Sequence, residues 1–201
     1  MGLVFMRQSD PDDPGDAMPS TIFKEDRPLT EAEFLAIGET PERIELFDGG
    51  LLVTPSPSPL HQRISTRLAI LLTPVAEQVG LLLHEAVNVR LQPNRVPIPD
   101  LVITTQIDYA ELIIDSSTVL LVCEILSPSN PDNDRVIKMS YYAMAGIPWY
   151  LLVNPVTGEL LLYKISDGKY ELHASAEPGV PLRLTDPVTV TIDPAELLPP
   201  P

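Results

Sequence analysis

The chain has 201 residues, of which 44% are hydrophobic, so it is long enough for one domain with a substantial core. Its formal net charge of −15, with only 13 Lys and Arg residues, argues against broad contact with nucleic acid, because phosphate binding normally needs clustered basic side chains. No apolar run approaches the roughly 20 residues of a membrane helix, no secretory signal is readable, and the one cysteine excludes an internal disulfide. We therefore expect a cytoplasmic protein with no membrane partner.

The chain begins with a polar segment, and the first element follows it. Residues 1–20 are rich in Pro and Asp and lack apolar periodicity, which predicts a flexible acidic tail. Residues 21–198 are expected to form a single domain. Thr30 followed by Glu33 is a capping-box pattern, which predicts a short helix that ends at Gly38.

A hairpin and a long helix are predicted next. The string RIELFDGGLLV is typical of two apolar strands around an Asp-Gly turn. The string PSPSPLHQ opens the longest helix, with Ser58 as its N-cap and Pro59 at its first position, and Gly80 ends it. His61 falls on the same face of this helix as Leu68, so we expect its side chain to point inward.

The remainder of the chain is predicted to consist mainly of strands. They are expected over residues 82–91, 98–104, 118–126, 149–153, 159–165 and 170–174. A helix is expected from about residue 133 to residue 145, and the segment DPAELLPPP allows one short final helix. This order of elements predicts an α/β fold with a mixed β-sheet flanked by helices.

Two carboxylates stand in runs from which burial should exclude them. Asp100 begins an apolar strand in VPIPDLVIT, and Glu124 is the only charged residue in VLLVCEILS. A buried charge is costly unless it is paired, protonated or bound to a cation. Two strand-borne carboxylates at one sheet edge would suit Mg2+ or Mn2+, which bind through one or two carboxylates with water and phosphate. The structural alternative is that each carboxylate forms a buried ion pair or caps a loop.

The sequence also resembles a known family. The string PD…E-x-L-S is similar to the PD-(D/E)XK nuclease superfamily, with Asp100 and Glu124 as its acidic pair. Five strings in order narrow the resemblance to the Uma-two family of restriction endonucleases: RIELFDGGLLV, SPSPLHQRIS, VPIPDLVIT, LVCEILSPSN and DRVIKMSYYAMAGIPWYLLVNP. The resemblance implies a restriction-endonuclease-like three-layer core. It also implies metal ligands at Asp100, Glu124 and the backbone carbonyl of Ile125, and metal-assisted hydrolysis of a DNA phosphodiester.

The chain departs from the superfamily pattern at one position. The pattern has Lys two residues after the Glu, where this chain has Leu126. Lys138, on the predicted helix that follows, resembles a displaced lysine that orients the attacking water or stabilises the developing anion. The alternative for Lys138 is an exposed ion pair with Asp134, one helical turn away.

Further candidates near the predicted site are less specific. Glu45 alternates with apolar neighbours, so solvent is its ordinary destination, whereas the resemblance places it near the metal as an additional acidic residue. His61 is either a satisfied core histidine or a ligand or base. Tyr142 is expected to pack, with hydrogen bonding to phosphate as the alternative. Cys123 should face away from Glu124 as an inert buried thiol.

Three classes of function remain open. The first is a metal-dependent DNA endonuclease, the second an inactive interaction module that kept the fold, and the third a small-molecule hydrolase with the same metal pair. The acidic composition favours the second and third, and the combination of Asp100, Glu124 and Lys138 favours the first. An acidic nuclease could still bind DNA as a homodimer if its few basic residues shared one cleft. The arginines considered for that cleft are Arg63, Arg67, Arg90 and Arg95.

Overall fold

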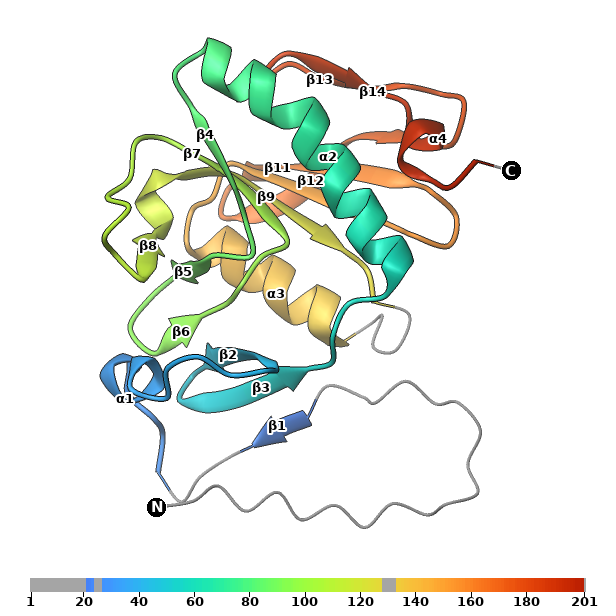
Figure 1. Ribbon diagram of the computed structural model, residues 1–201. Coiled ribbons are helices and arrows are strands. Elements are labelled where there is room, and N and C mark those ends of the chain that lie inside the picture. The colour runs from blue at the N-terminus through green and yellow to red at the C-terminus, as the bar shows by residue number, and fades with distance from the viewer. Residues whose placement is uncertain (1–20, 24–26, 128–132, 201) are drawn as a thin grey trace, which may run out of the picture.

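The computed structural model describes residues 21–23, 27–127 and 133–200, and a six-stranded sheet lies at its centre (Figure 1). From one edge to the other, its strands are β12 (Lys169–Ala176), β11 (Leu160–Ser166), β10 (Trp149–Val153), β9 (Val119–Ile125), β7 (Leu101–Thr104) and β4 (Leu82–Glu85). β9 and β10 run parallel, and the other neighbouring pairs are antiparallel. The predicted α/β fold with a mixed sheet is confirmed.

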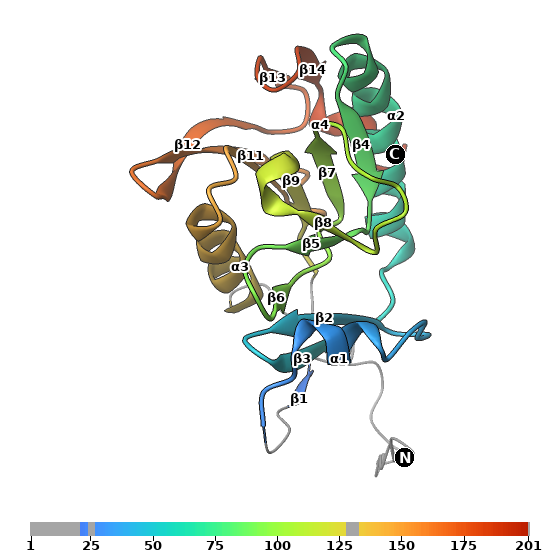
Figure 2. The same cartoon turned by 90° about the vertical axis from the view of Figure 1, so that its left-hand side faces the viewer.

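Two helices cover opposite faces of this sheet, α2 (Pro59–Gln78) and α3 (Asn133–Met144) (Figures 1 and 2). Leu68 of α2 packs in the same buried core as Cys123 of β9. Tyr142 of α3 packs in a second core on the other face. Because successive residues of a strand point to opposite faces, the side chain that follows Cys123 is directed toward α3. The predicted orientation of the buried Cys123 is therefore confirmed.

A smaller sheet lies across one end of the central sheet (Figure 1). Its strands, in spatial order, are β1 (Thr21–Phe23), β3 (Gly50–Thr54), β2 (Arg43–Phe47) and β6 (Arg95–Val96). β2 and β3 form the predicted hairpin, and Asp48 and Gly49 at its turn both have positive φ. A side chain at Gly49 would collide with Pro28, so the close approach of these segments also requires glycine there.

The predicted helix starts are confirmed in their capping contacts. α1 (Glu31–Leu35) begins with the reciprocal capping box of Thr30 and Glu33. Ser58 caps α2, since its hydroxyl accepts a hydrogen bond from the backbone N–H of His61. This cap fixes the first turn of α2, which carries His61 toward the end of the central sheet.

The predicted strand over residues 82–91 is wrong in its continuity. Ala86 has a φ of 52°, and the chain divides there into β4 and β5 (Asn88–Arg90). β5 leaves the central sheet and pairs in parallel with β8 (Ile113–Asp115). The strand expected over residues 98–104 is shorter than predicted, since β7 begins only after Asp100.

Several short elements were not predicted. They are β1, β6 and β8, the 3-10 turn η1 (Ser116–Thr118), and the pair β13 (Leu182–Leu184) and β14 (Val190–Ile192). The short final helix is present as α4 (Pro194–Leu197). The predicted tail, residues 1–20, lies outside the described residues, and the single domain over residues 21–198 stays a prediction. Among the described residues, no helix is both long and apolar enough to cross a membrane.

Candidate metal centre

Asp100 and Glu124 are brought together by the pairing of β7 with β9. Leu101 pairs with Cys123 in antiparallel register, so the preceding Asp100 lies beside Glu124 at the end of the strand pair. Both carboxylates are buried, with exposed fractions of 5% and 9%. Asp100 and Glu124, which the sequence analysis assigned to one site, are therefore neighbours at the end of the central sheet that faces the β2–β3 hairpin.

The Asp100 carboxylate accepts hydrogen bonds from three residues. Oδ1 accepts from the guanidinium of Arg43 at 2.9 Å, and Oδ2 accepts from the backbone N–H of Ile125 at 2.8 Å. His61 Nε2 lies 3.1 Å from Oδ2. Burial alone raises the pKa of Asp100. The hydrogen bond from His61 and the charge of Arg43 have the larger, opposite effect, so the pKa of Asp100 lies well below its usual range. Asp100 is therefore ionised at neutral pH.

The His61 ring contacts Asp100 through its Nε2 atom. Its Nδ1 atom is buried without a hydrogen-bond partner. The contact with Asp100 requires a hydrogen on Nε2, because an ionised carboxylate can only accept. His61 then donates to Asp100 and orients it, which places the side chain inward as the helix pattern predicted. Its role as ligand or base stays a prediction.

Glu124 lies on the α3 side of the sheet and has a different environment. Its Oε1 accepts a hydrogen bond from the Tyr142 hydroxyl at 2.6 Å and lies 3.5 Å from Lys138 Nζ. Burial raises the pKa of Glu124 to about 7, the charge of Lys138 opposes this rise, and the charge of Asp100 adds to it. Two neighbouring carboxylates with pKa values displaced in opposite directions are a pattern found at acid–base and metal sites.

Lys138 reaches this site from α3, as the resemblance implied. Its Nζ donates to Glu45 Oε1 at 2.9 Å, and it is buried, with an exposed fraction of 9%. Burial lowers the pKa of Lys138, but the charges of Glu124 and Glu45 raise it more, so the ammonium stays charged. The alternative of an exposed ion pair is wrong, because the amine is directed into the site; the side chain of Asp134 lies outside the described residues.

Glu45 is fully buried, so the expectation that it faces solvent is wrong. Its Oε1 accepts from Lys138 and from the backbone N–H of Ile98, the latter at 2.7 Å, whereas its Oε2 is buried without a hydrogen-bond partner. Polar and apolar residues do alternate along β2. The polar face of this strand, however, covers the end of the central sheet and does not face water. Glu45 thus positions the lysine, as the resemblance suggested in placing it near the site.

Arg43 is a site residue that the sequence analysis missed. It lies two residues before Glu45 on the same face of β2, and it contacts Asp100. Burial lowers the pKa of Arg43, but the charges of Glu45, Asp100 and Glu124 raise it to well above its usual value. The signal that could have found Arg43 is its i, i+2 relation to Glu45 in the string RIE.

Tyr142 does more than pack. Its ring lies 5.8 Å from that of Tyr150, and the side chain is fully buried, as expected for a core residue. Its hydroxyl donates to Glu124, however, so it holds a candidate ligand in place. Burial and the charge of Glu124 raise the pKa of Tyr142 well above its usual value, which keeps the hydroxyl a donor.

The donor set fits a divalent ion of the magnesium type. Three carboxylates, those of Asp100, Glu124 and Glu45, face the two cations of Arg43 and Lys138, so carboxylates outnumber the Arg and Lys side chains. One carboxylate oxygen of Glu45 also lacks a partner. Among the described residues, no three His, Cys, Asp or Glu side chains form a metal-binding group. A pair of carboxylates is nevertheless sufficient for Mg2+, which keeps several waters.

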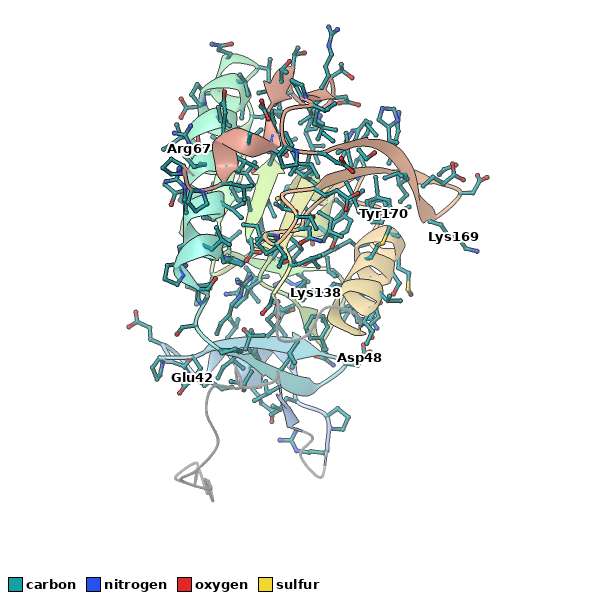
Figure 3. All side chains as sticks on the ribbon, turned by 90° about the vertical axis from the view of Figure 1, so that its right-hand side faces the viewer. Glu42, Asp48, Arg67, Lys138, Lys169 and Tyr170 are labelled. Atoms are coloured by element: carbon teal, nitrogen blue, oxygen red, sulfur yellow. The ribbon has the colours of Figure 1, made fainter. Side chains whose placement is uncertain are left out.

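The four arginines considered for a cleft between two subunits each make a contact within the single chain, and the shared cleft itself stays a prediction. Arg63 and Arg67 donate to the backbone carbonyls of Leu198 and Glu196, next to α4. Figure 3 shows Arg67 on this side of α2. Arg90 is paired with Glu31, and Arg95 with Asp48. Each is held by an internal contact, so these four side chains do not supply a continuous surface for DNA.

The opposite pKa shifts predict an unusual pH dependence of stability. Glu124 binds its proton more tightly in the folded chain (pKa about 7) than in the unfolded chain (about 4.5), so its ionisation destabilises the fold as the pH rises between these values. Between about pH 5 and about pH 8, we expect ionisation of Glu124 to lower the free energy of unfolding of the metal-free chain by about 2–3 kcal/mol. Urea unfolding at several pH values measures the loss.

Glu124→Gln should remove this pH dependence, whereas Glu171→Gln on the exposed strand β12 should leave it unchanged. Asp100 acts in the opposite direction, since its lowered pKa contributes stability that is lost only as the solution becomes strongly acidic. An unfolding free energy that is level or rises from pH 5 to pH 8 in the wild type, and does not respond to Glu124→Gln, would show that Glu124 is ionised throughout.

The layers of the fold, with two carboxylates at the ends of adjacent strands, define the class of restriction-endonuclease-like α/β proteins. A family profile described as "Putative restriction endonuclease" (Uma2) matches residues 31–195, and the chain belongs to this family. The chain is also similar to a solved structure described as a putative nuclease belonging to DUF820 from Anabaena variabilis ATCC 29413. That match has a TM-score of 0.70 and 17% sequence identity, and it covers 85% of this chain and 97% of the other. No curated protein matches the chain.

Proposed function

We propose that this chain is a metal-dependent endonuclease that hydrolyses DNA phosphodiester bonds. The observation that carries the proposal is the placement of Asp100 beside Glu124, with Lys138 directed at the same point from α3. Membership of a restriction endonuclease family supports a nuclease, and the contacts of the site supply the residue types that metal-assisted hydrolysis needs. Metal dependence and the choice of DNA are parts of the proposal.

Asp100, Glu124 and the backbone carbonyl of Ile125 would hold Mg2+ or Mn2+. When bound, such an ion lowers the pKa of a coordinated water and neutralises charge on phosphate oxygens. The backbone N–H of Ile125 already donates to Asp100, which aligns these two residues. His61 and Arg43 hold the Asp100 carboxylate ionised and fixed in orientation.

Lys138 is the group that would act on the reacting atoms. Its ammonium is fixed between Glu45 and Glu124, so a water or a developing anion near Glu124 would lie within reach of the same amine. A buried ammonium stabilises a developing negative charge more strongly than an exposed one, because water does not screen it. Glu45 positions this amine and is not itself expected to touch the substrate.

Homodimerisation would supply DNA contacts that the single chain lacks. Large apolar side chains on α3 support this part of the proposal, since Val136 and Met144 are more than half exposed, at 66% and 69%. Light scattering should give twice the chain mass at working concentration. A monomeric mass there contradicts the dimer and leaves the metal site unaffected.

One observation favours the two alternative classes. The net charge of −15 and the internal contacts of Arg63, Arg67, Arg90 and Arg95 leave little basic surface for a polyanion. An inactive interaction module or a small-molecule hydrolase would not need such a surface. A group of five charged side chains, four of them buried, however, costs stability and has no evident use in an inactive module.

Cleavage of nucleic acid with defined metal content separates these classes. Purified wild type is incubated with supercoiled plasmid, single-stranded DNA or RNA, in Mg2+, Mn2+ or EDTA. We expect plasmid cleavage with either ion and none in EDTA. Cleavage of RNA alone would change the substrate class, and no cleavage of any nucleic acid with either ion would contradict the nuclease and favour the alternatives.

A further inference from the structure

The Arg43 guanidinium is only partly used within the chain. Its NH1 atom donates to Asp100 at 2.9 Å, but Nε and NH2 are both buried and have no hydrogen-bond partner. Nε and NH2 form one planar edge of the guanidinium, whose two parallel N–H bonds match two oxygens of one carboxylate or phosphate. Arg43 therefore presents an empty bidentate edge at the metal centre.

Other arginines of this chain show how that edge is normally filled. Arg90 uses Nε and NH2 to hold Glu31, at distances down to 2.5 Å. Arg95 uses the same two nitrogens to hold Asp48, at 3.1 and 2.6 Å. Both edges are closed by a carboxylate of the chain itself, so the empty edge of Arg43 is not a general feature of arginines here.

Burial makes the empty edge costly. Donors of a charged group that are removed from water without a partner are destabilising, so buried donors in folded proteins almost always have one. Arg43 has two unpaired donors on one planar edge, whereas Lys138 is already engaged by Glu45 and Glu124 and has one N–H left. The missing partner is therefore an anion or acceptor that the chain does not provide.

We propose that the Nε–NH2 edge of Arg43 binds two oxygens of the substrate phosphate, while NH1 keeps its contact with Asp100. The inference rests on the proposed function and deepens it, because it names a phosphate-binding residue beside the metal ligands. A tetrahedral phosphate offers a pair of oxygens to such an edge. A lysine gives a point charge and cannot reproduce this geometry.

A surface groove lies beside the same arginine. It has a volume of about 310 Å3 between α1 and β2, and Arg43 lines it together with Phe34, Ile98 and Glu42. Ile44 and Leu46 of β2 pack with Phe34 of α1, whereas Arg43 is directed to the opposite face of β2, so phosphate must reach the Nε–NH2 edge from the central-sheet side of the hairpin. Because Glu42 at this groove repels anions, we expect phosphate alone to bind weakly and Mg2+ to strengthen the binding.

The Nε–H resonances of the arginines in the 15N-labelled full chain test the proposal directly. Inorganic phosphate is titrated with and without Mg2+, and the resonances are assigned by through-bond correlation. We expect the Arg43 resonance to shift in a saturable manner in Mg2+, and the Arg90 resonance, whose edge is filled, to stay. An Arg43 resonance that does not move, or that moves no more than that of Arg90, would overturn the proposal.

Arg43→Lys and the matched control Arg90→Lys extend the test to nucleic acid. With Ca2+ in place of Mg2+, binding of a labelled oligonucleotide should weaken about 10- to 100-fold in Arg43→Lys and stay near wild type in the control. Calorimetric Mg2+ affinity should stay within about threefold of wild type, which separates phosphate binding from damage to the metal site. Equal oligonucleotide binding by Arg43→Lys and wild type contradicts the role.

The two proposals fail differently. If phosphate shifts the Arg43 resonance but wild type cleaves no nucleic acid, the anion site stands and the nuclease is contradicted. If wild type cleaves DNA but phosphate leaves the Arg43 resonance unmoved, the nuclease stands and Arg43 only supports Asp100. Should Arg43→Lys fail to fold, the titration of the wild type still decides the question.

Discussion

Asp100→Asn is expected to weaken Mg2+ binding by at least about 100-fold and to lower DNA cleavage by about 1,000-fold or more, since the charge stabilisation that a bound metal supplies is worth several kcal/mol. The amide keeps the size of the carboxylate but removes its charge. Asp100 is the carboxylate that is ionised at neutral pH, so its loss removes the standing negative charge of the ligand pair. Calorimetric Mg2+ titration and plasmid cleavage measure the two effects.

The matched control is Asp167→Asn at the β11–β12 turn, which projects away from the body of the molecule in Figure 2. Asp167 is exposed and has a positive φ, a conformation that Asn also tolerates, so this variant should bind Mg2+ and cut as wild type does. Equal Mg2+ affinity of Asp100→Asn and wild type would contradict the site assignment.

A loss of stability must be separated from a loss of metal. Asp100→Asn leaves Arg43 without its closest carboxylate, and breaking a buried pair of this kind costs about 3 kcal/mol. Glu124→Gln provides a second variant, because Gln resembles the protonated form that Glu124 adopts below about pH 7. It should fold at least as well as wild type near neutral pH and still bind Mg2+ poorly.

The regular elements and the acidic pair were predictable from local pattern. Strands β9 and β10 are continuous apolar runs long enough to indicate burial on both faces, and Ser58 with Pro59 gives a helix start with a physical cause. Glu124 was identifiable because a charge inside such a run needs a partner. The pairing that sets it beside Asp100 joins β7 to β9 across β8 and η1, so no short connection indicated it.

Arg43 was missed, and alternation alone favoured solvent for Glu45, because a half-buried strand looks the same whichever way its polar face turns. Alternation gives the period of β2 but not what covers its charged side. Here the hairpin lies across the end of the central sheet, and only that tertiary contact buries both residues. The break at Ala86 has no local signature either, since alanine has no preference for positive φ.

Lys138→Met is expected to destabilise the metal-free chain by about 3–5 kcal/mol, because it removes the cation that compensates two buried carboxylates. It should also lower the rate of cleavage by about 100- to 1,000-fold, the range found when one preorganised charge-stabilising donor is lost. Figure 3 shows Lys138 on the inner side of α3, whereas Lys169 points outward from the β11–β12 hairpin. Lys169→Met is therefore the matched control and should be neutral in both measurements.

A double variant distinguishes the structural role of Lys138 from its chemical one. Glu45 is the fully buried partner of the amine, so Glu45→Gln in the Lys138→Met background removes the charge that was left uncompensated. Urea unfolding should then recover part of the lost stability, with a coupling energy of about 1–3 kcal/mol between the two positions. Plasmid cleavage should not recover, because no amine is present to act on the reacting atoms. Recovery of cleavage together with stability would contradict a chemical role, and would show that Lys138 serves only to neutralise Glu45.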